Sequence, residues 1–190
     1  MDVDKLAFWT LSIPLGLLEV WRSYTRYSST TKDRRTLTFI WLVIPGSTAL
    51  TMRLIRAGYG MKILENSWPK FALWLPMCSV ICVLGCILRT QSINQLGQWF
   101  TTSICTNENQ KIIDSGWYSR MRHPAYAGTL LSFVGVTLEL NNWLGLIGIL
   151  LPVFGVFRYR TFVEEKELEK HFGEQYRIYK KKVTKCFYFI

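Results

Sequence analysis

Five long apolar runs constrain this chain more than any other feature. They are Leu6–Val20, Leu37–Met52, Phe71–Leu88, Ala125–Leu140 and Trp143–Phe157. A helix needs roughly 17–25 apolar residues to cross a bilayer, and each run reaches or approaches that length once its flanking aromatic residues are included. We therefore predict about five transmembrane helices. The last two runs are short, so we expect protein to shield them partly from lipid.

The charged residues are separated from these runs. The chain is 49% hydrophobic, yet it carries 23 Lys and Arg against 13 Asp and Glu, for a net charge of +10. Apolar spans joined by basic loops produce this combination in membrane proteins. Nucleic-acid binding is the competing explanation of the positive charge, but no zinc-finger or RNP-type pattern is present. We predict a lipid bilayer as partner, and neither nucleic acid nor metal.

Only Asn141 and Asn142 separate the fourth and fifth apolar runs. Two helices joined so tightly must be antiparallel neighbours. The predicted fold is therefore an all-α integral membrane protein of about five transmembrane helices, the last two a tight hairpin, followed by a cytoplasmic C-terminal amphipathic helix. We divide the chain into N-terminal spans at 1–90 and a catalytic region at 91–190.

Loop charges predict the orientation in the membrane. The segment 22–36 holds five basic residues and one acid, Asp33, so it should stay in the cytoplasm and leave the N-terminus outside or in the lumen. The first run lacks a signal-peptide pattern and should remain a span. Counting spans forward places the loop 58–70 outside, and the interval 89–123 and the tail after Phe157 in the cytoplasm. The membrane would be a cell inner membrane or the endoplasmic reticulum.

The C-terminal segment has one apolar helical face that includes a carboxylate. Residues at spacings of three and four share this face: Thr161, Glu165, Leu168, Phe172, Tyr176, Tyr179 and Val183. A carboxylate on a buried face needs a cation or a hydrogen-bond donor. Glu165 therefore belongs either to an internal salt bridge, with Arg158 as one candidate partner, or to a site. Arg160 and Glu164 are expected to form an ordinary i,i+4 pair.

The stretch "SRMRHPAYAGTLL", residues 119–131, opens the fourth apolar run. Arginines at such a boundary can simply snorkel towards water. Pro124 suits the first turn of a helix, and His123 before it is either a capping residue or a ligand-binding residue.

Several separated segments together resemble one family. "LGQWF", "GWYSRMRHPAYAG" and "RTFVEEKELEKHFGEQYRIYKKKV" resemble, in this order, the isoprenylcysteine carboxyl methyltransferases, which are integral membrane enzymes that use S-adenosylmethionine. The likeness spans Leu96–Val183. It implies that cytoplasmic segments enclose the cofactor while the site opens towards the membrane. Where family members commonly have a histidine, this chain has Gln110, which can form hydrogen bonds but cannot carry charge.

The resemblance implies S-adenosylmethionine-dependent methylation of a carboxylate on a prenylated or otherwise lipophilic substrate. An α-carboxyl has a pKa of about 3.5, so this acceptor is already ionised and needs alignment and electrostatic support rather than a strong base. An arginine fork suits it. The expected catalytic residues are Arg160 and Glu165. The expected cofactor-binding residues are Gln110, Tyr118, Arg122, His123, Pro124, Tyr126 and Glu164.

Two other functions stay open at this point. One is an NADPH-dependent membrane reductase of the sterol-reductase type, because such enzymes share a related hairpin with an Arg-His-Pro element. The Glu-Glu pair and the later Phe-Gly-x-x-Tyr favour methyl transfer over this alternative. The other is a non-catalytic membrane adaptor whose basic C-terminal tail binds anionic lipid.

Overall fold

The computed structural model describes residues 34–64, 70–100 and 111–183. In these ranges the chain forms α-helices and two short 3-10 turns, with no strand beyond one isolated bridge between Lys62 and Asn142. The helices are α2 Arg34–Arg56, α3 Lys70–Leu96, α4 Pro124–Glu139, α5 Trp143–Phe172 and α6 Glu174–Lys182, and the turns are η1 Gly97–Trp99 and η2 Gly116–Ser119. The predicted first span, Leu6–Val20, lies outside the described residues.

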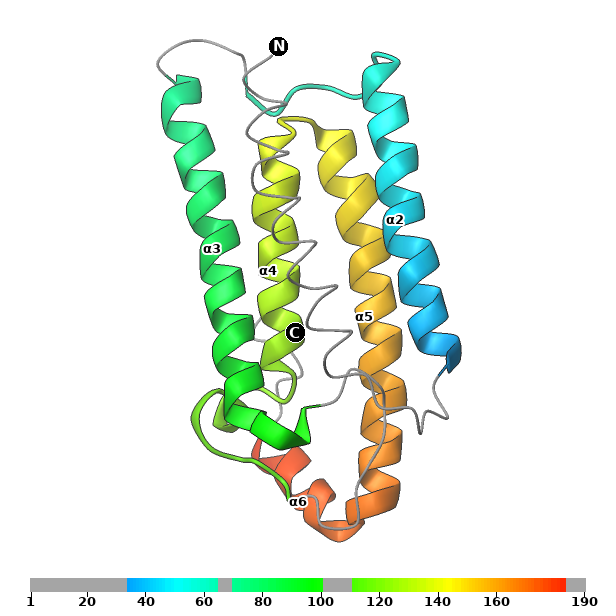
Figure 1. The fold of residues 1–190 in the computed structure, drawn as a ribbon, viewed down its shortest axis with the longest axis vertical. Helices are drawn as coiled ribbons and strands as arrows, with labels where there is room; N and C mark the ends of the chain where they lie inside the picture. The colour runs from blue at the N-terminus through cyan, green and yellow to red at the C-terminus, as the bar shows by residue number, and fades with distance from the viewer. Residues whose placement is uncertain (1–33, 65–69, 101–110, 184–190) are drawn as a thin grey trace.

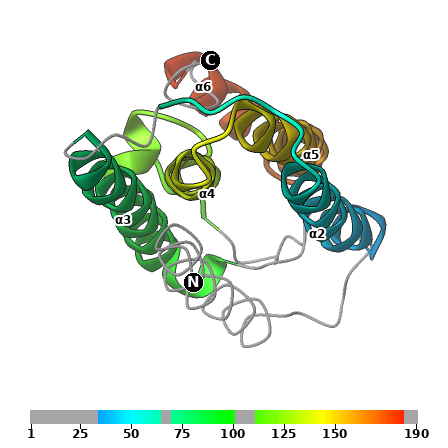
Figure 2. The same ribbon diagram turned by 90° about the horizontal axis from the view of Figure 1, so that it is seen from above.

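The helices form a bundle in which α4 is central (Figures 1 and 2). Helix α3 packs on one side of α4, α5 packs on the other, and α2 lies against α5. Helix α6 lies at one end of the bundle, which we call the α6 end. The α4–α5 turn lies at the opposite end. This order places the N-terminus of α4 and the C-terminal half of α5 together at the α6 end.

Three helices are long and apolar enough to cross a membrane, within the part of the chain that the structure describes. The candidate spans are Thr38–Arg56 in α2, Leu73–Trp99 in α3 and the following η1, and Trp143–Phe172, which is α5. The fourth predicted span is α4, whose 16 residues extend about 24 Å, less than a hydrocarbon core of about 30 Å. Helix α4 is therefore not among these candidate spans. It is a short central helix between longer neighbours, and it fits the expectation that this run is short and partly shielded by protein.

The sequence predicted a separate amphipathic helix that includes Thr161, and the boundaries of this prediction were wrong. Helix α5 continues without interruption for 30 residues to Phe172, because the segment after Phe157 contains good helix formers and no Gly or Pro before Gly173. Gly173, at a φ of 57°, ends α5 and leads into the nine-residue α6. The predicted apolar face nevertheless survives this break. Tyr176, Tyr179 and Val183 form a buried cluster against Leu168, Phe172 and Ile112.

Helices α3 and α4 approach closely because small residues line their contact. A Cβ atom on Gly135 would lie 2.5 Å from the backbone N of Cys82, and one on Gly128 would lie 2.6 Å from the backbone N of Arg89. Membrane helices commonly use small residues in this way. Cys78 and Cys82 are fully buried at this contact and act as packing residues.

The predicted tight hairpin between α4 and α5 is confirmed, and its two asparagines do more than separate the helices. Asn141 has a φ of 46° and exchanges two side-chain hydrogen bonds, each 2.8 Å, with the backbone of Leu64. The Asn142 side chain accepts a hydrogen bond from the Leu144 N–H and so caps α5. The turn is thereby fixed both to α5 and to the segment that follows α2.

Candidate active site

The segments 122–126 and 164–165 meet at the α6 end of the bundle. The Arg122 Nε atom lies 2.7 Å from Glu165 Oε1, and the Tyr126 hydroxyl donates to Glu164 Oε2 at 2.8 Å. These residues are about forty positions apart in the chain, and the α4–α5 hairpin brings them together. Two of the segments to which the resemblance assigns site residues therefore lie together.

The start of α4 explains this placement. Pro124 occupies the first turn, and His123 stands at the N-cap position but makes no capping hydrogen bond with its side chain. Tyr126 therefore lies in the first turn of α4 and faces the antiparallel α5. Arg160 and Glu164, one turn apart on α5, lie on the side that meets it.

Glu165 is the centre of an ionic cluster. Its carboxylate lies 2.7 Å from Arg122, 3.2 Å from His123 Nε2 and 3.0 Å from Lys180 of α6. Lys180 also contacts Glu169 at 2.9 Å, and hydrogen bonds to Glu169 and Glu165 raise the pKa of its ammonium. The internal ion pair considered for Glu165 thus exists. Its partners come from other segments, and Arg158 is not among them.

Tyr126 connects Arg160 to Glu164. Arg160 Nε donates to the Tyr126 hydroxyl at 2.8 Å, and that hydroxyl donates onward to Glu164. The expected direct i,i+4 pair of Arg160 with Glu164 is therefore replaced by a bridge through the phenol. Arg160 is only 4% exposed, and the His123 ring stacks on Tyr126 with centroids 5.7 Å apart.

Glu164 differs from Glu165 in the hydrogen-bonding capacity that its carboxylate has left for a further group. Its side chain is 29% exposed, Oε2 receives the Tyr126 hydrogen bond, and His123 Nδ1 lies 4.0 Å from the same oxygen. No described residue donates a hydrogen bond to Oε1. Glu164 can therefore receive a further cationic or hydrogen-bonding group, whereas the Glu165 carboxylate is already held by three partners.

Hydrogen bonds and an ion pair hold helix α6 against this cluster. The Tyr179 hydroxyl donates to the Tyr118 carbonyl and Arg122 Nη1 donates to the Val183 carbonyl, both at 2.8 Å. Lys182 lies 2.9 Å from Asp114, and its hydrogen bond lowers the pKa of that carboxyl. These contacts close the α6 end of the bundle around Glu165.

Two predicted cofactor residues are not part of this cluster. Tyr118 is buried, and its hydroxyl donates to the Ser92 carbonyl at 3.4 Å, so it ties η2 to α3. Gln110 lies outside the described residues. The cofactor roles of both residues remain predictions. Conversely, sequence reasoning did not single out Lys180, because the Gly173 break makes its distance from Glu165 unreadable from helical spacing.

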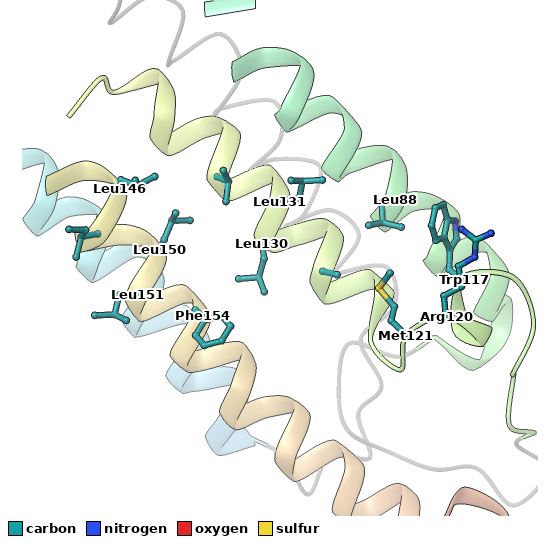
Figure 3. Close-up of a pocket in the computed structure, with 13 residues that line it drawn as sticks. Leu88, Trp117, Arg120, Met121, Leu130, Leu131, Leu146, Leu150, Leu151 and Phe154 are labelled. Atoms are coloured by element: carbon teal, nitrogen blue, oxygen red, sulfur yellow. The ribbon is translucent and has the colours of Figure 1, made fainter. Parts of the chain in front are cut away.

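An apolar cavity of about 750 Å³ lies between α4 and α5 and reaches Leu88 of α3 (Figure 3). Trp117, Arg120 and Met121 gather at one end of it, and leucines of α5 line the other. The full lining is Leu88, Trp117, Arg120, Met121, Ala127, Leu130, Leu131, Val134, Leu146, Ile147, Leu150, Leu151 and Phe154. Such a volume and composition suit a lipophilic ligand, since ligand pockets of this kind measure about 300–1,000 Å³.

Comparison with known proteins identifies related sequences. The family model described as phospholipid methyltransferase matches residues 76–175. Protein-S-isoprenylcysteine O-methyltransferase A of Arabidopsis thaliana is 32% identical over 146 residues, which are 75% of this chain and 74% of that protein. Protein-S-isoprenylcysteine O-methyltransferase B of the same plant is 37% identical over 103 residues, 53% of this chain and 52% of that protein.

The relatives are mostly longer than the matched part. The Xenopus laevis protein-S-isoprenylcysteine O-methyltransferase is 32% identical over 84% of this chain but only 58% of its own length. The chain thus spans about half the length of several curated relatives it matches. A solved structure of a eukaryotic intramembrane Ras methyltransferase, isoprenylcysteine carboxyl methyltransferase, has the same fold. It superposes with a TM-score of 0.60 at 22% identity, covering 85% of this chain and 55% of that one.

Proposed function

Because this chain is an integral membrane protein of the isoprenylcysteine carboxyl methyltransferase and phospholipid methyltransferase family, we propose that it methylates the carboxylate of a lipophilic, isoprenylcysteine-like acid. S-adenosylmethionine would be the methyl donor. One observation carries the proposal. Arg122–Tyr126 and Glu164–Glu165 meet in one polar cluster at the α6 end, and Met121 and Ala127, the residues on either side of 122–126 in the sequence, line an apolar cavity between α4 and α5.

The residues of the cluster fit this cofactor. Glu164 has an oxygen that accepts no hydrogen bond from the described residues, and it suits the cofactor's ammonium group. The stacked rings of His123 and Tyr126 offer a flat wall beside it. When bound, S-adenosylmethionine supplies an electrophilic methyl group on a positively charged sulfur.

The remaining task of the protein is to hold the acceptor. A carboxylate is ionised at neutral pH, so the site needs a fixed cation and exclusion of water rather than a strong base. We assign the cation to Arg160, which is buried and oriented by the Tyr126 hydroxyl. A planar guanidinium can meet both oxygens of a carboxylate.

The lipophilic part of the substrate would occupy the apolar cavity. Its walls are aliphatic and aromatic side chains of α4 and α5. A tail placed there could remain in an apolar environment while the carboxylate stays at the α6 end. Such an arrangement of tail and carboxylate suits an acceptor that enters from the lipid bilayer. The bilayer is also the partner that we expect for an integral membrane protein.

We further propose that the α6 end faces the cytoplasm. Basic residues are concentrated there: Lys166, Lys170, Arg177, Lys180, Lys181 and Lys182. An excess of Lys and Arg near the ends of spans is typical of the cytoplasmic side. Helix α6 would then close the site from the cytoplasm.

A transfer assay tests the proposed function. Detergent-purified protein is incubated with radiolabelled S-adenosylmethionine and N-acetyl-S-farnesylcysteine, and the methyl ester is released by mild alkali as labelled methanol. We expect label in the ester with wild-type protein. A second assay on membrane extracts would search for the natural acceptor. If label entered only alkali-stable products, carboxylate methylation would be wrong.

Replacing Glu165 with glutamine should abolish or severely weaken cofactor binding while the protein stays folded. An amide cannot neutralise Arg122 and Lys180, so the cluster that positions Glu164 would lose its centre. We expect the affinity for S-adenosylhomocysteine, measured by calorimetry, to fall at least about tenfold.

Glu169→Gln is the matched control for this substitution. It makes the same change of charge on the same helix and removes the other partner of Lys180, but it leaves Glu165 intact. We expect its cofactor affinity to stay near wild type. If Glu165→Gln also kept wild-type affinity and transfer rate, Glu165 would have a structural role only.

A further inference from the structure

Glu139 is a buried carboxyl group that the proposed mechanism does not use. It is the last residue of α4, at the end of the bundle opposite α6 (Figure 1), and only 1% of it is exposed. An ionised side chain is seldom buried so completely unless an opposite charge pairs with it. The surroundings of Glu139 therefore decide whether its carboxyl group is charged.

The described residues donate one hydrogen bond to this carboxyl group. The Ser79 hydroxyl of α3 donates to Glu139 Oε1 at 3.2 Å, whereas Oε2 is buried and has no hydrogen-bond partner. Both oxygens of a carboxylate would need donors to replace the water lost on burial. An uncharged carboxyl group needs a donor only at its carbonyl oxygen, and Ser79 supplies one. The contacts thus suit a proton on Oε2.

No cation lies against Glu139 in the part of the chain that the structure describes. On α3 the titratable neighbours are Cys78 and Cys82, and a thiol carries no positive charge in either protonation state. The first half of α5 has no titratable residue, and the other one in α4, Tyr126, lies at the far end of that helix. Lys62, whose backbone bridges to the α4–α5 turn, is exposed and forms no ion pair with Glu139. These residues would therefore leave a carboxylate at position 139 without a counter-charge.

The position of Glu139 in its helix also disfavours a negative charge. The C-terminus of an α-helix carries a partial negative charge from its unpaired carbonyl groups, so an acid there is destabilising. No basic residue lies in the last turn of α4. The Trp74 indole of α3 donates to the Leu138 carbonyl at 3.1 Å, so this neighbouring donor serves the backbone and not the carboxyl group. Burial, contacts and helix position all favour the uncharged form.

We infer that Glu139 is a proton-binding site, held as an uncharged acid that joins α4 to α3 through Ser79. Loss of the proton would leave a charge without a counter-charge between two packed helices, so the proton stabilises their contact. The inference concerns the end of the bundle away from the candidate active site and does not depend on the proposed function. The competing explanation is an ionised Glu139 paired with a cation that the described residues do not supply.

Infrared difference spectroscopy reads the protonation state directly. Spectra of the detergent-purified wild-type protein and of Glu139→Gln are recorded at neutral pH and subtracted. The carbonyl stretch of a protonated carboxyl group lies at a higher frequency than the stretches of a carboxylate, and it shifts downwards in heavy water. We expect the wild type to show this protonated band in excess. Carboxylate bands in its place would overturn the proposal.

Two further variants test the origin of the band. Ser79→Ala should keep the protonated band but move it to higher frequency, because the carbonyl oxygen loses its donor. Glu174→Gln, which removes an α6 acid whose side chain is 64% exposed, is the matched control and should subtract only carboxylate bands. A band that stayed unshifted in Ser79→Ala would refute the hydrogen bond between α3 and α4.

The stability of the protein should also depend on pH through Glu139. A glutamate exposed by unfolding ionises near about pH 4.3, so above that pH the folded protein holds one proton more than the unfolded chain. The ratio of the unfolding constant of the wild type to that of Glu139→Gln should therefore rise with pH, by up to about tenfold per unit. Denaturant titrations in detergent at about pH 5 and about pH 7 measure this ratio. A ratio that stayed flat or fell with pH would contradict the inference, since an ionised and paired Glu139 gives that result.

Discussion

Arg160→Lys is expected to lower kcat by about 100- to 1,000-fold, comparable to the loss of one preorganised donor to a developing charge. The lysine would keep the positive charge but lose the planar fork and the Nε hydrogen bond to Tyr126. Because the acceptor carboxylate must be held in line with the methyl group, misplacement should slow transfer more than it weakens binding. Initial rates over a range of acceptor concentrations separate kcat from KM.

Tyr126→Phe provides the comparison for this substitution. It removes the hydroxyl that orients Arg160 but leaves the guanidinium and the aromatic wall, so its loss of kcat should be smaller than that of Arg160→Lys. The double variant should be little slower than Arg160→Lys alone, because both changes disturb one interaction. An unchanged kcat in Arg160→Lys would remove Arg160 from the site.

Gly135→Leu is expected to prevent the native packing of α3 against α4. Even a Cβ atom at this position would lie 2.5 Å from the backbone N of Cys82, and backbone cannot move aside as a flexible side chain can. Methylene groups added to a packed core typically cost about 1–3 kcal/mol of folding free energy, and we expect this substitution to cost more. Thermal unfolding in detergent, followed by circular dichroism, measures it.

Gly155→Leu is the matched control. Gly155 lies within α5, and a Cβ atom there would meet nothing within 4 Å. This variant should be as stable as wild type or slightly more stable, since glycine disfavours helix by about 1 kcal/mol. Equal unfolding midpoints for the two variants would show that close contact of α3 and α4 is not what holds the bundle together.

The positions of most helices could be predicted because apolar runs and loop residues report them directly. The hairpin followed from two adjacent asparagines, and in the structure it brings Arg122–Tyr126 against Glu164–Glu165. The continuation of α5 could not be seen, because the change from apolar to charged residues near Arg158 looks like a boundary although helix propensity runs on to Phe172. Hydropathy reports the environment of a helix and not where it ends.

Within the site, residue types were easier to predict than partners. The apolar face showed that Glu165 needed a cation, but the choice of Arg122 and Lys180 over Arg158 depends on how α6 folds back after Gly173. The link from Arg160 through Tyr126 to Glu164 was equally hidden, since it joins two helices through one hydroxyl.

Calorimetric titration of the detergent-purified wild-type protein tests most directly whether the α6 end is a methyl-donor site. S-adenosylhomocysteine and NADPH are titrated separately into the same preparation. Our account predicts saturable binding of S-adenosylhomocysteine, lost in Glu165→Gln and kept in Glu169→Gln, and no binding of NADPH. Binding of NADPH without S-adenosylhomocysteine would contradict it and indicate a reductase, and binding of neither would indicate a non-catalytic membrane protein.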